Sequence, residues 1–190
     1  GDIVGGVVAA GLAEQFGQQV IVDNRPGAAG NIAVEMAARA AGDGYTVLFG
    51  NIGTIAINPA LMRDFPINTV RDLACVSMVA DVSSMLTVHA SVPAGNVEEF
   101  VRYAKGRPGQ INYGSAGNGS TFHIVTELFA ALTKTRLTHI PYKGSGPALI
   151  DTLSGQVDMT WISMLVVRSH INAGRLRLLG VTTPQRVKAL

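Results

Sequence analysis

Hydrophobic residues recur along this chain at two spacings, one typical of helices and the other of buried strands. The helical spacing predicts helices over residues 3–16, 31–41, 97–105, 121–132, 147–155 and 163–173. Short apolar runs predict strands at residues 20–22, 45–49, 110–111, 137–142, 157–161 and 176–182, with extended runs at 73–82 and 85–89. Strands that alternate with helices in this way indicate an α/β protein whose sheets are mostly parallel and covered on both faces.

A glycine-rich stretch, Asn112–His123, lies between the short segment Gln110-Ile111 and the helix that follows. Its glycines allow the backbone to turn sharply and to come close to a ligand. Ser120 or Thr121 is placed to cap the helix, because a short hydroxyl accepts the first free N–H groups. A helix start beneath such a loop favours an anion-binding site. An ordinary strand–helix turn without a ligand is the alternative interpretation.

Other loops carry similar signals. Residues 50–54 form a second glycine-bearing loop behind the predicted strand 45–49, and residues 143–147 form a third. Asn58-Pro59 resembles a helix cap with proline at the first helical position. Asn96 followed by Glu99 resembles a capping box. In open α/β sheets, ligands bind outside the carboxyl ends of the strands, where loops of this kind gather.

The composition narrows the class of protein. At 190 residues the chain can form one large domain or two small lobes. Its 15% charged residues, against roughly 25% in average globular proteins, and its 47% hydrophobic residues fit extensive buried sheet. The net charge of +2 and the lack of a Lys/Arg run argue against nucleic-acid binding. No apolar segment approaches the ~18 residues that span a bilayer. Cys75, the single cysteine, is predicted to be a buried small hydrophobe.

The familiar catalytic and cofactor motifs are absent. The sequence has no G-x-x-x-x-G-K-[ST] phosphate loop and no G-x-G-x-x-G in a strand–helix context. A serine hydrolase elbow needs glycine two residues before the serine, but Tyr113 stands there before Gly114-Ser115. The histidines lack metal-ligand spacing; they are His89, His123, His139 and His170. We therefore expect no metal, no cofactor and no enzymatic activity.

Four side chains near the predicted loops have both a functional and a structural interpretation. His123, on the first turn of its helix, is a packing residue or else a hydrogen-bond donor or loop brace, and a general base is the least favoured interpretation. Asp158 either orients loop amides and meets a ligand ammonium or pairs locally at a strand edge. Lys143 either balances ligand charge or is solvated. Trp161 either belongs to the core or forms a stacking platform.

Uncharged donors can hold a carboxylate. Micromolar affinity corresponds to about −8 kcal/mol, and a hydrogen bond to a charged group contributes roughly 1.5–3 kcal/mol. Four or five donors, partly offset by ordering costs, reach that range without a buried arginine. The hydroxyls and amides of the loop are the expected supply, and they belong to Ser115, Asn118, Ser120 and Thr121.

Several motifs, in order along nearly the whole chain, resemble the Bug family of extracytoplasmic solute receptors of tripartite tricarboxylate transporters. They are N-R-P-G-A-A-G-N-I-A (Asn24–Ala33), D-G-Y-T-V-L (Asp43–Leu48), Y-G-S-A-G-N-G-S-T-F-H (Tyr113–His123), H-I-P-Y-K-G-S-G-P-A-L (His139–Leu149), S-G-Q-V-D (Ser154–Asp158) and L-G-V-T-T-P-Q-R (Leu179–Arg186). The combination is highly specific.

The resemblance implies a type II periplasmic-binding-protein fold, with two α/β lobes of mostly parallel sheets joined by crossover strands. We expect a first lobe over residues 1–87 with a return segment at 181–190, and a second lobe over 88–180. A carboxylated solute would bind between them, and hinges near residues 86–89 and 179–182 would let the lobes close. Family members usually begin with a further strand and a P-F-x-P-G-G loop and continue past the position of Leu190. We therefore expect residues to be missing at both ends.

The resemblance also implies the function and the site. The function would be periplasmic capture of a small mono- or dicarboxylate by a monomer that delivers it to membrane permease subunits and binds no nucleic acid. Alternatives are an effector-sensing domain of the same fold and an α/β enzyme that acts on a small carboxylate. Carried over by position, the first-lobe ligand loop is Asn51, Ile52, Gly53 and Thr54; the second-lobe residues are Ser115, Ala116, Gly117, Asn118, Gly119, Ser120, Thr121, His123 and, in a scaffold role, Asp158. Many relatives have an acidic residue where Ile162 stands, which argues against an amino-acid ligand.

Overall fold

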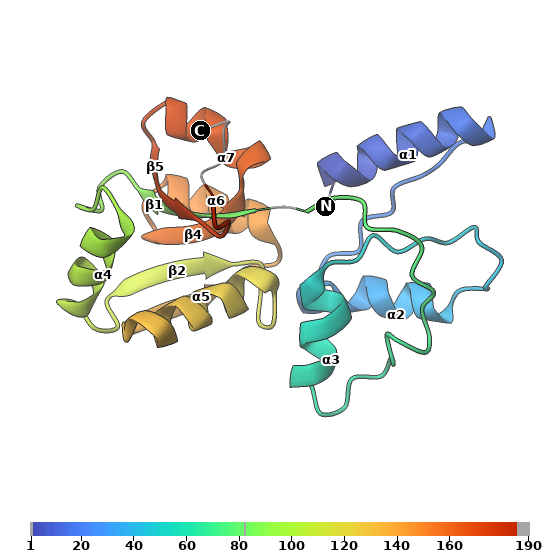
Figure 1. The fold of residues 1–190 in the computed structure, drawn as a ribbon, viewed down its shortest axis with the longest axis horizontal. Coiled ribbons are helices and arrows are strands. Elements are labelled where there is room, and N and C mark those ends of the chain that lie inside the picture. The colour runs from blue at the N-terminus through green and yellow to red at the C-terminus, as the bar shows by residue number, and fades with distance from the viewer. Residues whose placement is uncertain (1, 82, 186–190) are drawn as a thin grey trace. The chain divides into compact units, whose positions relative to one another are not determined.

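A computed structural model describes residues 2–81 and 83–185 of the chain (Figure 1). The chain divides into two compact units, residues 1–74 (unit 1) and residues 75–190 (unit 2). The lobe boundary predicted at residues 87 and 88 falls inside a strand of unit 2, Ser84–His89. The division into lobes therefore stays a prediction.

Unit 2 is built on one five-stranded sheet with the order β3-β2-β4-β1-β5. The strands are β1 (Ser84–His89), β2 (Ile111–Ser115), β3 (Leu137–Pro141), β4 (Met159–Ser163) and β5 (Leu176–Val181). β2 pairs in parallel with both β3 and β4, whereas β1 is antiparallel to both β4 and β5. Four of the five strands therefore run in one direction, and the prediction of a mostly parallel sheet is confirmed for this unit.

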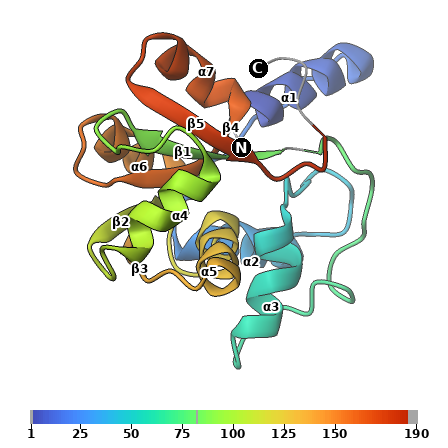
Figure 2. The same ribbon diagram turned by 60° about the vertical axis from the view of Figure 1, so that its left-hand side comes forward.

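Helices cover both faces of this sheet (Figures 1 and 2). Helices α4 (Val97–Lys105) and α5 (Thr121–Thr133) pack on one face, and α6 (Ser145–Leu153) and α7 (Met164–Asn172) pack on the other. Alternate side chains of a strand point to opposite faces. Leu86 accordingly belongs to the core cluster under α4 and α5, and Met85 to the cluster under α6 and α7. Both are 1% exposed.

Local capping signals set the start of two of these helices. The Asn96 side chain accepts the Glu99 N–H at 2.9 Å, while the Glu99 carboxylate accepts the N–H of Gly95 and the Asn96 amide. These bonds lower the pKa of Glu99, the Gly95 N–H contributing most. Ser120 caps α5. Both predicted caps are confirmed, because each depends on residues only three positions apart.

Unit 1 contains helices α1 (Asp2–Phe16), α2 (Asn31–Arg39) and α3 (Asn58–Leu61), with short helical turns at Ala28–Gly30 and Gly53–Ile57. Its described residues, 2–74, form no β-strand, so the strands predicted at 20–22 and 45–49 are wrong. A strand requires a hydrogen-bonded neighbour. These segments have none, and Ile21, Tyr45 and Val47 are 77%, 92% and 68% exposed.

Four further sequence predictions are corrected. Residues 73–81 form no strand, and Cys75 is exposed rather than buried. Asn58 is not a helix cap: it has helical backbone angles and continues the turn that Gly53–Ile57 begins. The strand predicted at 110–111 extends to Ser115, which shortens the glycine-rich loop to residues 116–120.

Candidate functional site

The predicted loop of unit 2 lies at the carboxyl edge of three parallel strands. β2, β3 and β4 end at Ser115, Pro141 and Ser163, and α5, α6 and α7 follow them. Because the strands run in the same direction, these three ends share one edge of the sheet. The loops after β2 and β3 lie side by side there, since the Tyr142 N–H donates to the Ser115 carbonyl at 3.1 Å. This is the edge at which open α/β sheets bind ligands.

Two glycines shape the loop. Gly117 has φ 116° and Gly119 has φ 78°, values that residues with a Cβ atom rarely adopt. A Cβ atom on Gly117 would also lie 3.3 Å from the Tyr142 carbonyl oxygen. The sequence therefore needs glycine at both positions to bring the loop back to the start of α5.

Ser115 ties the loop together from below. It is 1% exposed, and its Oγ accepts the Gly117 N–H at 3.1 Å, lies 3.2 Å from the Gly117 carbonyl oxygen, and lies 2.6 Å from Nε2 of His139. The hydroxyl is fully occupied by these three partners. It therefore braces the loop instead of facing outward as a donor.

Ser120 and His123 brace the other side of the loop. Ser120, 7% exposed, accepts the His123 N–H through its hydroxyl at 3.4 Å. His123 in turn accepts the Gly119 N–H through Nδ1 at 3.1 Å. A neutral imidazole that accepts at one nitrogen carries its hydrogen on the other. His123 therefore braces the loop through Nδ1 and carries its donor at Nε2, and contact with a ligand stays a prediction.

Three rings are stacked beside the loop. His139 lies between Tyr113 and His123, with ring centroids 4.8 Å and 4.2 Å away. Burial, followed by His123, lowers the pKa of His139 to about 4, although Glu127 acts to raise it. The Tyr113 hydroxyl donates to Glu127 at 2.5 Å, and burial, then this bond, raises the pKa of the phenol. His139 and Tyr113 are therefore both uncharged at neutral pH.

His139 is a residue beside the loop that the sequence analysis did not single out as a site residue. Its Cα lies opposite that of Tyr113 in the parallel pairing of β2 and β3. The two positions are far apart in the chain, and only this register brings them together. The signal was present in the H-I-P-Y-K-G motif, which is part of the family resemblance, but its register against β2 is not encoded locally.

The structure changes which groups of the loop can face a ligand. The Ser115 hydroxyl is used internally, as are the N–H groups of Gly117 and Gly119. The Ser120 oxygen accepts the His123 N–H, and the Ser120 N–H donates to the Gly117 carbonyl. Asn118 is exposed, and no side-chain hydrogen bond engages it among the described residues. Ala116, Thr121 and His123 are half-buried. The outward donors are therefore fewer than the sequence suggested.

Asp158 lies away from this loop. Its carboxylate accepts the Asn112 N–H at 2.7 Å, near the start of β2, whereas the loop follows the end of β2. The local interpretation of Asp158 is therefore the one that its contacts support. Trp161, 6% exposed, belongs to the core, and Lys143 is exposed. Ile162, 3% exposed, packs in the cluster under α6 and α7.

The first-lobe candidates form a compact turn in unit 1. The Asn51 side-chain oxygen accepts the N–H groups of Gly53 and Thr54 at 2.8 and 3.3 Å, so Asn51 caps the helical turn that follows. Thr54 is 4% exposed and donates to the Asn51 carbonyl, whereas Ile52 is 63% exposed. A Cβ atom on Gly30 would lie 2.7 Å from Thr54 Cγ2. The N-R-P-G-A-A-G-N motif therefore packs directly against this turn.

The chemistry of the site favours binding over catalysis. Ser115 and His139 are of the types that form a nucleophile–base pair, but the serine is buried, and a histidine with a pKa of about 4 is a weak base at neutral pH. Among the described residues, no three His, Cys, Asp or Glu side chains are arranged to hold a metal ion.

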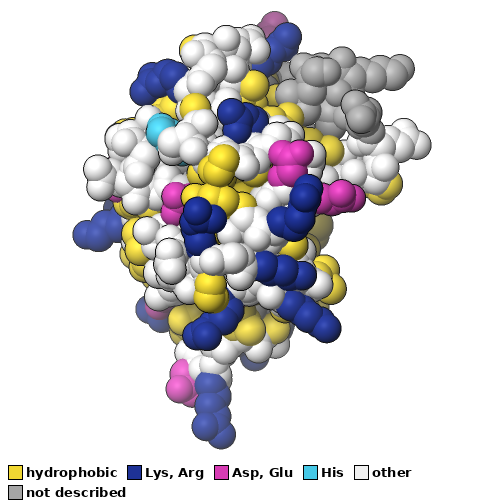
Figure 3. All heavy atoms as spheres, turned by 90° about the vertical axis from the view of Figure 1, so that its left-hand side faces the viewer, with side chains coloured by type: hydrophobic (Ala, Val, Ile, Leu, Met, Phe, Trp, Pro, Cys, Tyr) yellow, Lys and Arg dark blue, Asp and Glu magenta, His cyan; other side chains and the backbone are white. Residues whose placement is uncertain are grey.

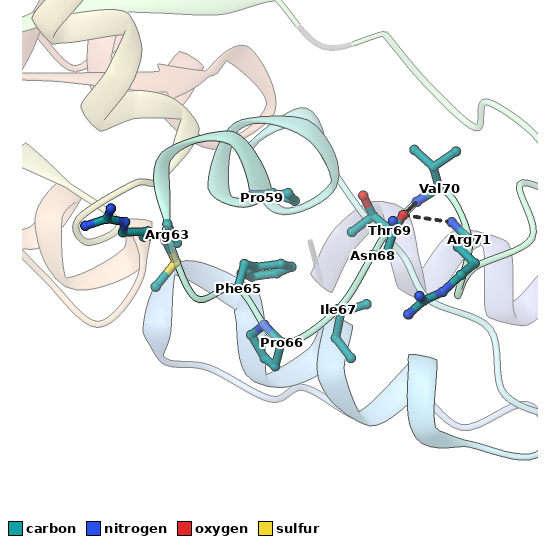
Figure 4. Close-up of a pocket in the computed structure, with 10 residues that line it drawn as sticks. Pro59, Arg63, Phe65, Pro66, Ile67, Asn68, Thr69, Val70 and Arg71 are labelled. Carbon is teal, nitrogen blue, oxygen red and sulfur yellow. Dashed lines mark hydrogen bonds between the residues drawn. The ribbon is translucent and has the colours of Figure 1, made fainter.

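Unit 1 also has an open hollow of about 430 Å³ between residues 59 and 71 (Figure 4). Pro59, Phe65, Pro66 and Ile67 line it, and Arg63 and Arg71 stand at opposite ends. Arg71 is paired with Asp72 at 2.6 Å. None of the predicted ligand-binding residues lines this hollow.

The surface is mixed in charge. On the face shown in Figure 3, Lys and Arg side chains stand among uncharged, apolar and acidic ones. In the part of the chain that the structure describes, none of the helices combines the length and apolar character needed to cross a membrane.

Comparison with known proteins shows which family the chain matches. The family model described as tripartite tricarboxylate transporter family receptor matches residues 4–190. BugT of Bordetella pertussis is 37% identical over 186 residues, which are 97% of this chain and 57% of BugT. The chain thus spans just over half the length of this relative.

Solved structures show the same fold. A periplasmic transporter superposes with a TM-score of 0.95 at 34% identity, covering 99% of this chain and 63% of its own. The R. palustris protein Rpa4515, solved with adipate, superposes with a TM-score of 0.92 at 37% identity, covering 97% of this chain and 62% of its own. The predicted fold class, an α/β fold of the periplasmic binding proteins, is confirmed by these similarities.

Proposed function

Because the chain belongs to the family of tripartite tricarboxylate transporter receptors, we propose that it captures a small organic carboxylate in the periplasm and delivers it to membrane permease subunits. The protein acts as a monomeric receptor and not as an enzyme. Its ligand leaves chemically unchanged.

The single observation that carries this proposal is the braced loop at the carboxyl edge of the unit 2 sheet. Internal bonds from Ser115 and His123 hold the loop in shape before any ligand arrives. A preformed site pays less ordering entropy on binding. The start of α5 beneath it contributes a positive partial charge that favours an anion.

The ligand class follows from the neutral character of this loop and from the relative with adipate. Asn118 and the Nε2–H of His123 are the donors proposed to contact one carboxylate, and Ala116 and Thr121 stay predicted contacts by their place beside them. The unit 1 turn, Asn51–Thr54, stays a predicted contact for the remainder of the ligand. Asp158 serves as scaffold, and a mono- or dicarboxylic acid without an ammonium group fits best.

Calorimetric titration of the protein with adipate, and with the uncharged adipamide as a control, tests the proposal. Adipate should bind saturably and raise the melting temperature, adipamide should do neither, and the recovered adipate should be intact by mass spectrometry. Equal binding of both compounds, or conversion of adipate, would contradict a carboxylate receptor. A melting screen over mono- and dicarboxylates then identifies the preferred acid.

A further inference from the structure

Among the residues that the structure describes, His139 is the one shown to contact both Ser115 and His123. Its Nε2 lies 2.6 Å from Ser115 Oγ, and its ring stacks on His123 at 4.2 Å. Its other face is covered by Tyr113, which is itself 0% exposed. None of the residues predicted to contact the ligand has this position between Ser115 and His123.

We propose that His139 is a positioning residue that holds the carboxylate loop in its binding shape, by donating a hydrogen bond from Nε2 to Ser115 and by supporting the ring of His123. The inference deepens the proposed function and rests on it for its binding measurements.

The hydrogen-bond count around Ser115 sets the tautomer of His139. The serine hydroxyl has one hydrogen, and the Gly117 carbonyl oxygen lies within reach of it at 3.2 Å. The Gly117 N–H already donates to the same oxygen. All three contacts are satisfied together when His139 Nε2 carries the hydrogen and donates to Ser115 Oγ. The hydroxyl then donates to the Gly117 carbonyl, which closes the turn.

The stacking of His139 on His123 helps to fix the orientation of the His123 ring. His123 accepts the Gly119 N–H only while its Nδ1 is unprotonated and its ring keeps its orientation. His139 covers one face of that ring. A change at His139 therefore acts on Gly117 through Ser115 and on Gly119 through His123.

The surroundings keep His139 uncharged. The titratable groups around it are His123 and Glu127 from α5 and Tyr113 from β2; Tyr142, which follows β3, has its hydroxyl on Asp151 of α6. Burial and His123 lower the pKa of His139, which Glu127 only partly offsets. A neutral ring is what the Nε2–H tautomer requires.

Two substitutions separate the donor from the ring. His139→Phe keeps a flat ring for stacking and removes the donor, whereas His139→Gln keeps a side-chain N–H donor and removes the ring. His170→Gln, on α7 away from the loop, is the matched control. Each protein is titrated with adipate by calorimetry, and each melting temperature is measured.

We expect His139→Phe to weaken adipate binding about tenfold, the effect of one lost hydrogen bond in the loop, and His139→Gln to recover part of that loss. Ser115→Ala combined with His139→Phe should cost no more than the larger single change, because both act through one bond. His139→Phe and His139→Gln proteins that bind adipate like the His170→Gln control would overturn the proposal.

A measurement without ligand keeps this test separate from the proposed function. In ¹⁵N-labelled wild-type protein, nitrogen–proton correlation spectra of the imidazoles should show His139 as the neutral Nε2–H tautomer from pH 8 to pH 5. The amide signals of Gly117 and Gly119 should both shift in the His139→Phe protein. The Nδ1–H tautomer in wild type would overturn the inference even if adipate binds. Absence of adipate binding with the Nε2–H tautomer present would overturn the receptor function instead.

Discussion

The carboxylate of Asp158 accepts the Asn112 N–H at 2.7 Å, and the Asp158 N–H donates to the Asn112 carbonyl at 2.9 Å. The His89 N–H also donates to the carbonyl of Asp158. Asp158 thus joins the starts of β2 and β4 with the end of β1. Its side chain replaces the ladder bond that the sheet would otherwise need at this point.

Removing the Asp158 carboxylate should affect stability but not ligand affinity. Asp158→Ala leaves the Asn112 N–H without its acceptor, and we expect it to lower the free energy of unfolding by about 1–3 kcal/mol. Asp158→Asn should cost less, because its amide oxygen still accepts. Fluorescence of Trp161, the single tryptophan and a core residue of unit 2, reports the unfolding. A large loss of adipate affinity in a stably folded Asp158→Asn protein would show that the carboxylate contacts the ligand.

The features that the sequence predicted well depend on near neighbours. The Asn96 and Ser120 caps each involve an N–H three residues ahead, so the residue types alone identify them. The glycine positions at 117 and 119 are likewise local requirements of a tight turn. The shape of the loop between β2 and α5 could therefore be predicted from its own residues.

The features that the sequence predicted poorly depend on distant partners. Val20–Val22 and Tyr45–Phe49 have strand-like composition, yet no neighbouring strand pairs with them in the structure. His139 reaches Ser115 only through the register of β3 against β2. Asp158 and Asn112 are joined in the same way, across strands that a local pattern does not align.

Ala29→Gly and Gly30→Ala should change the stability of unit 1 in opposite directions. Ala29 has φ 54°, and Ala29→Gly should raise the free energy of unfolding by about 0.5–1 kcal/mol by relieving left-handed strain. Gly30 has φ 92° and a prospective Cβ 2.7 Å from Thr54 Cγ2. Gly30→Ala should therefore destabilise unit 1 and loosen residues 51–54.

Urea unfolding and hydrogen exchange measure these two effects. Faster exchange at the Gly53 and Thr54 amides in Gly30→Ala, with the unit 2 amides unchanged, is the expected pattern, because both amides donate to Asn51 in this turn. If Gly30→Ala is as stable as wild type, the close packing of Gly30 on Thr54 is incorrect.

Substitution of Ser120 should mainly lower stability, whereas substitution of Asn118 should mainly lower adipate affinity. Ser120→Ala removes a helix cap and should cost about 0.5–2 kcal/mol of stability. Its side chain is only 7% exposed and its oxygen accepts the His123 N–H within the loop, so adipate affinity should fall only slightly. Asn118→Ala should leave the melting temperature unchanged and weaken adipate binding by up to about tenfold, since Asn118 is exposed at the loop. Calorimetry and thermal unfolding of both proteins decide, and the reverse pattern would reassign the donor role to Ser120.

Tyr142 should make the protein sensitive to alkali. Burial, and then the hydrogen bond to Asp151 at 2.6 Å, raises the pKa of Tyr142 to about 12, against about 10 in the unfolded chain. The unfolded state loses this proton first, so the free energy of unfolding should fall as the pH rises from 10 to 12. Tyr142→Phe removes this contribution and should flatten the slope. Urea unfolding between pH 8 and 11.5 measures it, and identical slopes would exclude the raised pKa.

His139 should make the protein sensitive to acid in the opposite sense. Burial lowers the pKa of His139 to about 4, whereas an unfolded histidine titrates near 6.5. Between these values the unfolded state binds a proton that the folded state does not. The stabilisation from His139 is therefore complete above pH 6.5 and lost progressively as the pH falls to 4. His139→Phe removes this dependence. The free energy of unfolding of wild type, measured relative to that of the variant, should therefore fall as the pH is lowered from 7 to 4. Trp161 fluorescence in urea at pH 7, 6, 5 and 4 provides the comparison, with His170→Gln as the control. A constant difference between His139→Phe and wild type across this range would show that His139 titrates normally in the folded protein.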